Sequence, residues 1–268
     1  MTTRIAVCGA AGRMGKTIIE TCSEMENINV TAAIEHSDSP CLGMDSGELA
    51  GIGTNEIKIV SEILDVLDDF DVIIDFTLPE ATLSNLEQCV SGQKAMVIGT
   101  TGLNKEQKQT IQLAGESIGI VFAPNMSIGV NLCFKLAELA AEIIGEQSDI
   151  EIIEAHHRMK KDSPSGTAVR LGEIIADTLG RNLSECAVYG REGITGERDR
   201  KTIGFETIRA GDIVGDHTVM FGMQGERVEI THKATNRRNF ASGALLAADW
   251  ITEKKLGLFD MQDVLGLR

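Results

Sequence analysis

The sequence predicts an α/β protein with an N-terminal doubly wound parallel sheet and a second α+β domain that contains a mostly antiparallel sheet. Three observations predict this class. Short β-branched runs alternate with helical patterns through residues 4–125, a turn with three glycines joins the first run to the first helix, and extended segments separated by glycine-containing turns follow Gly204. Strand–helix alternation is typical of parallel sheets, whereas strands joined by short turns are typical of antiparallel ones.

The N-terminal strands are predicted from continuous apolar runs at 5–7, 30–34, 57–60, 72–76, 95–98 and 120–122. Runs of this kind indicate strands that are buried on both faces. Helices are predicted between them, including 79–90 and 105–117. Pro79 suits the first position of a helix, and Asn104 suits an N-cap.

The second half of the chain shows a different pattern. A strand at 150–155 precedes an amphipathic helix at 167–179, and extended segments follow at 205–210, 217–221 and 228–231. Gly211-Asp212 and residues 222–225 supply turns between these segments. The polar, glycine-bearing stretch 191–201 is predicted to be a mobile loop, and residues 240–254 are predicted to be helical.

Charge and cysteine content narrow the function classes. The 268 residues carry a formal net charge of −15, so neither nucleic acid nor a membrane surface is an expected partner. No apolar run reaches transmembrane length, and the first residues lack the pattern of a signal peptide. Six cysteines without a C-x-x-C pair fit reduced thiols, which favours a cytoplasmic location.

The turn Gly9-Ala10-Ala11-Gly12-Arg13-Met14-Gly15 follows the first strand and opens a helix. Glycines let the backbone approach a pyrophosphate, and a helix N-terminus offers N–H groups and a positive dipole end. Glu35 ends the second strand, where a carboxylate would accept ribose hydroxyls. The spacing departs from G-x-G-x-x-G, and a purely structural turn is the alternative. The flanking strand and helix, together with Glu35, favour a Rossmann-type cofactor site.

Three further turns follow predicted strands at the edge where open α/β sheets bind ligands. They are Asp75-Phe76-Thr77, Gly99-Thr100-Thr101-Gly102 and Ala123-Pro124-Asn125-Met126-Ser127. Their small and hydroxyl-bearing residues leave room for a cofactor and offer hydrogen bonds. One such turn could be a plain connection, but three at the same edge favour a cofactor site.

A basic cluster stands out in this acidic chain. His156-His157-Arg158-Met159-Lys160-Lys161 ends a strand, and 162–167 opens a helix at Gly166 and Thr167. Cations, helix N–H groups and a hydroxyl suit an anionic ligand, and histidine with lysine can supply protons. The alternatives are a solvated basic surface and, for Ser165, a simple N-cap. No metal site is expected, because adjacent strand residues face opposite ways and no Cys or Asp completes a zinc pattern.

These segments together resemble the 4-hydroxy-tetrahydrodipicolinate reductase family. The resemblance rests on residues 9–15, on 99–102 and most specifically on 154–167, and it continues through 209–215 and 231–234. It implies a cofactor domain of residues 1–126 plus 236–268, and a substrate-binding and oligomerisation domain of residues 127–235 that assembles a homotetramer. It also implies reduction of 4-hydroxy-tetrahydrodipicolinate to tetrahydrodipicolinate by NADH or NADPH with loss of water, in the diaminopimelate route to lysine.

The resemblance also implies roles for individual residues. His156 would be the acid/base and Lys160 the proton donor, while His157, Gly166 and Thr167 would bind the dicarboxylate substrate. The implied cofactor residues are Gly9, Ala10, Ala11, Gly12, Arg13, Met14, Glu35, Gly99, Thr100, Thr101, Ala123, Pro124, Asn125 and Met126.

Two other function classes stay open from the sequence. A semialdehyde dehydrogenase would need a nucleophilic cysteine, but Cys133 lies in an apolar helical pattern and Cys186 is far from any motif. A nucleotide-sensing module without turnover would not require the basic cluster. Cofactor oxidation in the presence of substrate separates the enzyme from the sensor.

The residue after Glu35 bears on cofactor preference. Many members of the family place arginine there, and some carry a second arginine where this chain has Leu78; here the residue after the acid is His36. A 2′-phosphate needs a neighbouring cation, and histidine lacks the bidentate fork of arginine. NADH is therefore predicted to be preferred, with NADPH usable through a protonated His36; Arg13 is the alternative partner for the phosphate.

Overall fold

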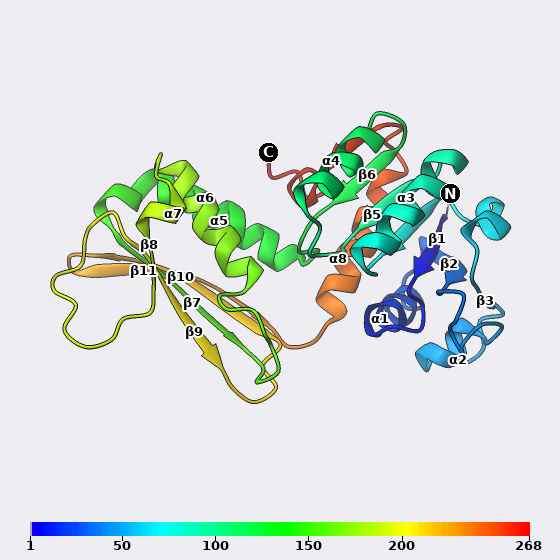
Figure 1. Cartoon of the computed structure of the whole chain (residues 1–268), viewed down its shortest axis with the longest axis horizontal. Coiled ribbons are helices and arrows are strands. Elements are labelled where there is room, and N and C mark those ends of the chain that lie inside the picture. The colour runs from blue at the N-terminus through cyan, green and yellow to red at the C-terminus, as the bar shows by residue number, and fades with distance from the viewer. Residues whose placement is uncertain (1) are drawn as a thin grey trace. The chain divides into compact units, whose positions relative to one another are not determined.

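A computed structural model describes residues 2–268, which form two compact units (Figure 1). One unit contains the chain up to Ile128 together with Arg237–Arg268, and the other contains Gly129–Asn236. The chain therefore passes between the units twice, and the C-terminal segment belongs to the same unit as the N-terminal one. None of the helices formed by residues 2–268 is long and apolar enough to cross a membrane.

The first unit is built on a seven-stranded, wholly parallel sheet with the order β12-β6-β5-β4-β1-β2-β3. The strands are β1 (Thr3–Cys8), β2 (Ile28–Ile34), β3 (Ile59–Val60), β4 (Val72–Asp75), β5 (Ala95–Ile98), β6 (Gly119–Phe122) and β12 (Gly257–Phe259). The helices are α1 (Arg13–Cys22), α2 (Ser46–Ala50), α3 (Pro79–Gly92), α4 (Lys105–Ala114), α8 (Arg238–Ile251) and α9 (Met261–Val264), with a 3-10 segment at Ile63–Asp69.

Both faces of this sheet are buried, as the continuous apolar runs predict. Ile5 and Val7 of β1 pack with α1 and α8 on one face, and Ala6 and Cys8 pack with α3 and α4 on the other. Two details differ from the sequence prediction. The strand expected at 57–60 is only two residues long, and the short edge strand β12, which pairs with β6, has too little apolar sequence to show a pattern.

The second unit contains a five-stranded sheet with the order β11-β10-β7-β9-β8. Its elements are α5 (Ile128–Ile144), a 3-10 turn (Gly145–Gln147), β7 (Asp149–His156), α6 (Gly166–Thr178), α7 (Leu183–Cys186), β8 (Ala187–Tyr189), β9 (Ile203–Arg209), β10 (Gly215–Met223) and β11 (Glu226–Ala234). Helices α5 and α6 lie along one face of the sheet (Figure 1).

The second sheet is mixed. Strand β10 pairs antiparallel with β11 across the turn at 222–225, as that short turn predicts. The turn at Gly211-Asp212 does not join neighbouring strands as predicted, because β7 lies between β9 and β10 and itself pairs antiparallel with β10. Strand β9 instead pairs in parallel with both β7 and β8. The reason is that the chain leaves β7 through α6 before it returns to the sheet, and a crossover through a helix joins parallel strands.

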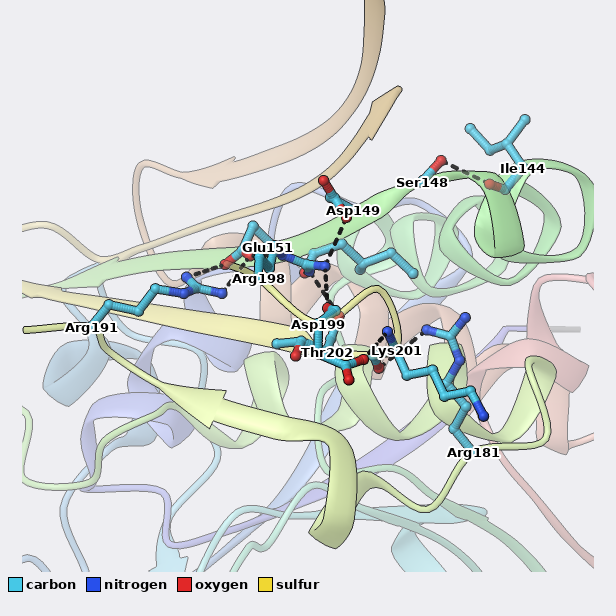
Figure 2. Close-up of polar contacts among 11 residues, drawn as sticks. Ile144, Ser148, Asp149, Glu151, Arg181, Arg191, Arg198, Asp199, Lys201 and Thr202 are labelled. Atoms are coloured by element: carbon cyan, nitrogen blue, oxygen red, sulfur yellow. Dashed lines mark hydrogen bonds and ion pairs between the residues drawn. The ribbon is translucent and has the colours of Figure 1, made fainter. Parts of the chain in front are cut away.

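Residues 190–202 connect β8 to β9 without helix or strand, which agrees with the loop predicted at 191–201. Two arginines attach this loop to β7 (Figure 2). Arg191 donates to both carboxylate oxygens of Glu151, at 3.0 and 2.8 Å, and Arg198 donates to Glu151 and to Asp149, each at 2.9 Å. Gly204 makes room for this ion-pair cluster, because a Cβ there would lie 1.8 Å from a Glu151 oxygen.

Candidate active site

The turn after β1 has the geometry of an anion-binding site. Gly9 has φ +66°, which favours glycine, and a Cβ on Gly15 would lie 2.2 Å from the carbonyl oxygen of Gly9. Gly12 is the N-cap of α1, so no side chain caps this helix, and its first turn carries no acidic residue. The helix N-terminus is therefore ready to receive a negatively charged group such as a dinucleotide pyrophosphate.

Glu35 lies directly beside this turn. Its Oε1 accepts a 2.9 Å hydrogen bond from the backbone N–H of Ala11, and its Oε2 accepts one of 3.2 Å from the N–H of His36. The His36 ring is mostly exposed, with Nε2 4.0 Å from Oε2 of Glu35. Glu35 thus joins the end of β2 to the phosphate turn, and an exposed imidazole stands next to the carboxylate.

The ends of β4 and β5 are joined through the fully buried carboxylate of Asp75. Its Oδ1 accepts hydrogen bonds from Thr77 Oγ1 at 2.6 Å and from Thr100 Oγ1 at 3.1 Å, and its Oδ2 accepts one from Asn85 at 2.8 Å. Gly99 is needed beside this network because a Cβ there would lie 2.3 Å from the Phe76 ring. Thr100 is consequently buried, whereas the next residue in the predicted set, Thr101, is exposed.

The segment after β6 is held by α8. Ala123 and Met126 are buried, and a Cβ on Gly243 of α8 would lie 1.7 Å from the Met126 carbonyl oxygen. Asn125 accepts a 2.9 Å hydrogen bond from the N–H of Ser127, and Pro124 is exposed. The four predicted strand-end turns of the first unit thus lie at the carboxyl edge of one parallel sheet, which is where Rossmann-type sheets bind dinucleotides.

The predicted substrate residues gather at the end of β7 in the second unit. The strand ends at His156, which is buried with Nδ1 2.6 Å from Oε2 of Glu154. His157 follows the strand and is half-buried, and its Nδ1 has no hydrogen-bond partner within residues 2–268. Lys160 lies in the next turn, with Nζ 2.9 Å from Oδ1 of Asp162. Because adjacent residues of a continuing strand face opposite ways, both histidines can reach one ligand only where the strand ends, and β7 ends at His156.

Helix α6 begins beside this histidine pair. Its N-cap is Ser165, whose Oγ accepts from the Ala168 N–H at 3.2 Å, so the N-cap interpretation of this residue is confirmed. Gly166 is exposed, and a Cβ there would meet nothing within 4 Å; Thr167 is half-buried. Ser165 caps this end of α6 at the Ala168 N–H, and the positive end of the helix dipole lies next to the histidine–lysine turn, where it suits an anion.

The charges around His156 are strongly coupled. Burial by itself would raise the pKa of Glu154, but hydrogen bonds from Arg209 and His156 outweigh burial and lower that pKa. Burial lowers the pKa of His156; Glu154 opposes this effect, while Lys160 and Arg209 add to it. The geometry therefore favours a neutral imidazole that donates through Nδ1 to an ionised carboxylate.

Sequence reasoning missed the buried residues that support this site. Glu154, Arg209 and His217 were not predicted as site residues, although Glu154 and His156 stand two apart on a strand and therefore share a face. That spacing was the available signal. Within residues 2–268 no group of three or more metal-binding side chains is close enough to hold an ion.

The cysteines do not favour covalent aldehyde chemistry. All six are free thiols. Burial raises the pKa of Cys133 and also that of Cys186, so neither thiol is activated as a thiolate. The semialdehyde alternative therefore has no nucleophile among the two cysteines considered for it.

A parallel sheet with an uncapped glycine turn, and a second unit with a buried histidine–carboxylate pair beside a lysine, define a nicotinamide-dependent oxidoreductase of the Rossmann class. Sequence comparison is more specific. Residues 3–126 match the family described as dihydrodipicolinate reductase, N-terminus, and residues 129–265 match dihydrodipicolinate reductase, C-terminus. The chain belongs to the dihydrodipicolinate reductase family.

Individual relatives agree with this assignment. A protein of Methylococcus capsulatus named 4-hydroxy-tetrahydrodipicolinate reductase is 58% identical over all 268 residues, which is 100% of both chains. The structure of a dipicolinate-bound dihydrodipicolinate reductase from Paenisporosarcina sp. TG-14 is 27% identical, with 98% of this chain and 99% of that chain covered and a TM-score of 0.78. An amine dehydrogenase from Mycobacterium smegmatis, 9% identical with a TM-score of 0.65 over 96% of this chain and 94% of that chain, shares the fold.

Proposed function

We propose that this protein reduces 4-hydroxy-tetrahydrodipicolinate to tetrahydrodipicolinate with NAD(P)H and loss of water, in the diaminopimelate route to lysine. The observation that carries the proposal is the cluster at the end of β7. A buried imidazole, a lysine and the N-terminus of α6 lie together in an otherwise acidic chain. This combination matches a small dicarboxylate that must also receive a proton.

Substrate binding and proton transfer are assigned to different residues of the second unit. Gly166, Thr167 and His157 bind the substrate carboxylates, through the N-terminus of α6 and the turn after β7. His156 acts as the acid/base and Lys160 donates a proton to the substrate, so that the electron density left by hydride addition is neutralised.

The cofactor site is proposed on the first unit. The predicted residues of the turn 9–14, with Glu35, Gly99–Thr101 and Ala123–Met126, would hold the dinucleotide, and the nicotinamide supplies hydride when bound. The uncapped N-terminus of α1 fits a pyrophosphate. NADH is the preferred cofactor in this proposal, because Glu35 accepts ribose hydroxyls while only the exposed His36 stands where arginine would bind a 2′-phosphate.

The proposal includes the oligomeric state of the protein and its cellular location. The protein forms a homotetramer through the second unit and works in the cytoplasm on a small-molecule substrate, without nucleic acid or membrane as a partner. The six free thiols support a reducing compartment, and the charge of −15 disfavours polyanionic partners.

The proposal is tested by following NADH oxidation while a synthase supplies the unstable substrate. His156→Ala and Lys160→Ala are each expected to reduce turnover by about 100- to 10,000-fold, the range of general acid–base contributions. NADH affinity, measured by fluorescence, should stay within twofold (roughly), because both residues lie outside the predicted cofactor set.

Lys161→Ala is the matched control, since Lys161 is the neighbouring exposed cation with no assigned role. It should retain near-normal turnover. Normal turnover in both catalytic variants would contradict the roles assigned to His156 and Lys160. If the unmodified protein oxidised neither NADH nor NADPH in the presence of substrate, the proposed reaction would be wrong.

A further inference from the structure

Glu154 is a buried carboxylate that accepts several hydrogen bonds and contacts the proposed catalytic residue His156. Only 1% of the residue is exposed. Arg209 holds both oxygens with two hydrogen bonds of 2.8 Å, and the Ser165 N–H and the Thr207 hydroxyl donate to Oε1 at 3.1 and 3.2 Å. The remaining contact is the 2.6 Å bond to Nδ1 of His156. With so many donors around it, the carboxylate is ionised and acts only as an acceptor.

This arrangement determines the tautomer of His156. Since Glu154 can only accept, Nδ1 of His156 carries the hydrogen, and Nε2 is left as the basic atom. Nε2 lies beside Gly215, where a Cβ would stand only 3.0 Å away. The glycine therefore keeps the reactive nitrogen unobstructed on that side.

Arg209 connects the supports of both proposed catalytic residues. Besides Glu154, its Nη2 donates at 2.6 Å to the backbone carbonyl oxygen of Asp162. The Asp162 carboxylate in turn holds Lys160 at 2.9 Å. One guanidinium thus joins the partner of His156 to the partner of Lys160, from a strand that neither catalytic residue occupies.

We propose that Glu154 and Arg209 are positioning residues of the reaction centre: Glu154 holds His156 as the Nδ1–H tautomer, and Arg209 offsets the charge of Glu154 and ties it to the turn that carries Lys160. This inference rests on the proposed function of His156 and Lys160. Arg209 makes the pair different from a bare carboxylate–histidine dyad, because the guanidinium prevents the carboxylate from holding a second proton on the imidazole.

Several titratable groups face His156, and their charges predict whether removing each one raises or lowers the titration midpoint of His156. Glu154 on its own strand favours the protonated imidazole, whereas Arg209 on β9 and Lys160 in the following turn disfavour it. His217 on β10 packs edge-on against the ring, with centroids 5.0 Å apart, and Asp162 faces Lys160 and Arg209. Removing Glu154 should therefore lower the titration midpoint of His156, and removing Arg209 should raise it.

The experiment is an NMR titration of His156 in the free protein labelled with nitrogen-15 histidine, with His156→Gln used to assign its signal. Glu154→Gln is expected to lower the midpoint and to lose the single Nδ1–H tautomer at high pH. Arg209→Met is expected to raise the midpoint. Steady-state assays should show kcat lowered about 10- to 100-fold in each variant, a typical loss for a supporting residue, with the KM for NADH unchanged.

The same strand offers a matched control pair. Glu151 and Arg198 form an ion pair at 2.9 Å (Figure 2). Glu151 stands three residues before Glu154 on β7, so its side chain faces the other side of the strand. Glu151→Gln and Arg198→Met should leave the His156 midpoint and tautomer unchanged. If Arg209→Met does not fold, Arg209→Lys keeps a charge but loses the fork, and it should lower kcat with a smaller shift in midpoint.

Opposite shifts in the two variants, absent from both controls, support the inference. Shifts of the same sign, equal shifts in the control pair, or a mixed tautomer in the unmodified protein would overturn it. Because the titration is measured on the protein without substrate or cofactor, its result does not depend on the result of the reductase assay. A protein that oxidised neither NADH nor NADPH would contradict the proposed function and leave the titration result to decide the positioning roles.

Discussion

His217 is buried in the second unit, between Ser165 and His156. Its Nε2 is 2.8 Å from Oγ of Ser165, the N-cap of α6, and its ring packs against His156. The residue is 7% exposed, and burial lowers its pKa to about 3, with the charges of His156 and His232 acting in the same direction. A histidine of this kind is neutral in the folded protein.

This burial makes stability sensitive to acid. A histidine in the unfolded chain takes up its proton near pH 6.5, whereas His217 in the folded protein does not until about pH 3. The unfolded state therefore binds more protons as pH falls through this window, and the folded state loses stability. At pH 5 the loss from this one group is about 2 kcal/mol relative to pH 8.

His217→Gln should remove this part of the acid sensitivity, since glutamine has no proton to gain. Urea unfolding at pH 8 and pH 5 measures it: the drop in unfolding free energy should be smaller in His217→Gln than in the unmodified protein. His36→Gln, at an exposed histidine, is the control and should leave the drop unchanged. An identical pH dependence in all three proteins would show that His217 is protonated in the folded state.

His36 is predicted to determine the preference between NADH and NADPH. His36→Arg adds a bidentate cation beside Glu35, so the ratio of kcat/KM for NADPH to that for NADH should rise about tenfold or more. In the unmodified protein the ratio should rise as pH falls toward 6, because acid favours the protonated imidazole. That trend should vanish in His36→Gln.

Both cofactors are compared in steady-state assays across the pH range. A strong NADPH preference that does not depend on pH would contradict the prediction. It would indicate that another cation, with Arg13 at the phosphate turn as the candidate, binds the 2′-phosphate.

At the scale of elements, the β1–α1 turn depends on close backbone approach. A Cβ on Gly15 would meet the Gly9 carbonyl oxygen and lie 2.7 Å from Cα of Ala10, and neither atom can rotate away. Gly15→Ala should displace the helix N-terminus from the phosphate position. NADH should bind about tenfold more weakly or worse, and thermal stability should fall, since overpacking of this kind costs roughly 1–3 kcal/mol.

Gly222→Ala is the control for this prediction. Its added Cβ would come no closer than 3.7 Å to the Asp149 carbonyl oxygen, and the residue lies in the other unit. Fluorescence titration with NADH and thermal unfolding compare the two variants. Unchanged NADH affinity in Gly15→Ala would mean that the turn does not position the cofactor.

At the scale of the whole molecule, the second sheet predicts assembly. Helices α5 and α6 cover one face, while Ile153, Ile208 and Met220 stand on the other face, and Ile208 is 48% exposed. Such a face is stabilised when another sheet covers it, and the family resemblance implies further copies of the same chain. Light scattering at micromolar concentration should therefore report four times the chain mass of 28.8 kDa.

Ile208→Lys should shift this assembly toward smaller species, because it places a charge on the face of the sheet that the predicted assembly covers. Lys201→Ala, in the exposed loop before β9, is a surface control that should leave the mass unchanged. A stable monomer of the unmodified protein would contradict the tetramer.

Features that depend on local chemistry could be predicted from the amino-acid sequence. Strands buried on both faces appear as unbroken apolar runs, and a glycine turn between a strand and a helix indicates a candidate phosphate-binding turn, because the constraints lie within a few residues. The basic cluster at the end of β7 was visible for the same reason. The N-caps Asn104 and Ser165 also follow from local hydrogen bonding.

The distant residues that surround the candidate site could not be predicted from the sequence. Glu154 and Arg209 are 55 residues apart, and they meet because β7 and β9 pair in parallel with His156 opposite Arg209. His217 reaches Ser165 across 52 residues because β10 pairs antiparallel with β7, which places His217 opposite Glu154, whose Oε1 accepts from the Ser165 N–H. Strand order and register depend on the packing of α6 against the whole sheet, and a shift of one residue would turn each of these side chains to the opposite face. No local pattern contains that information, since it arises from the burial of the complete core.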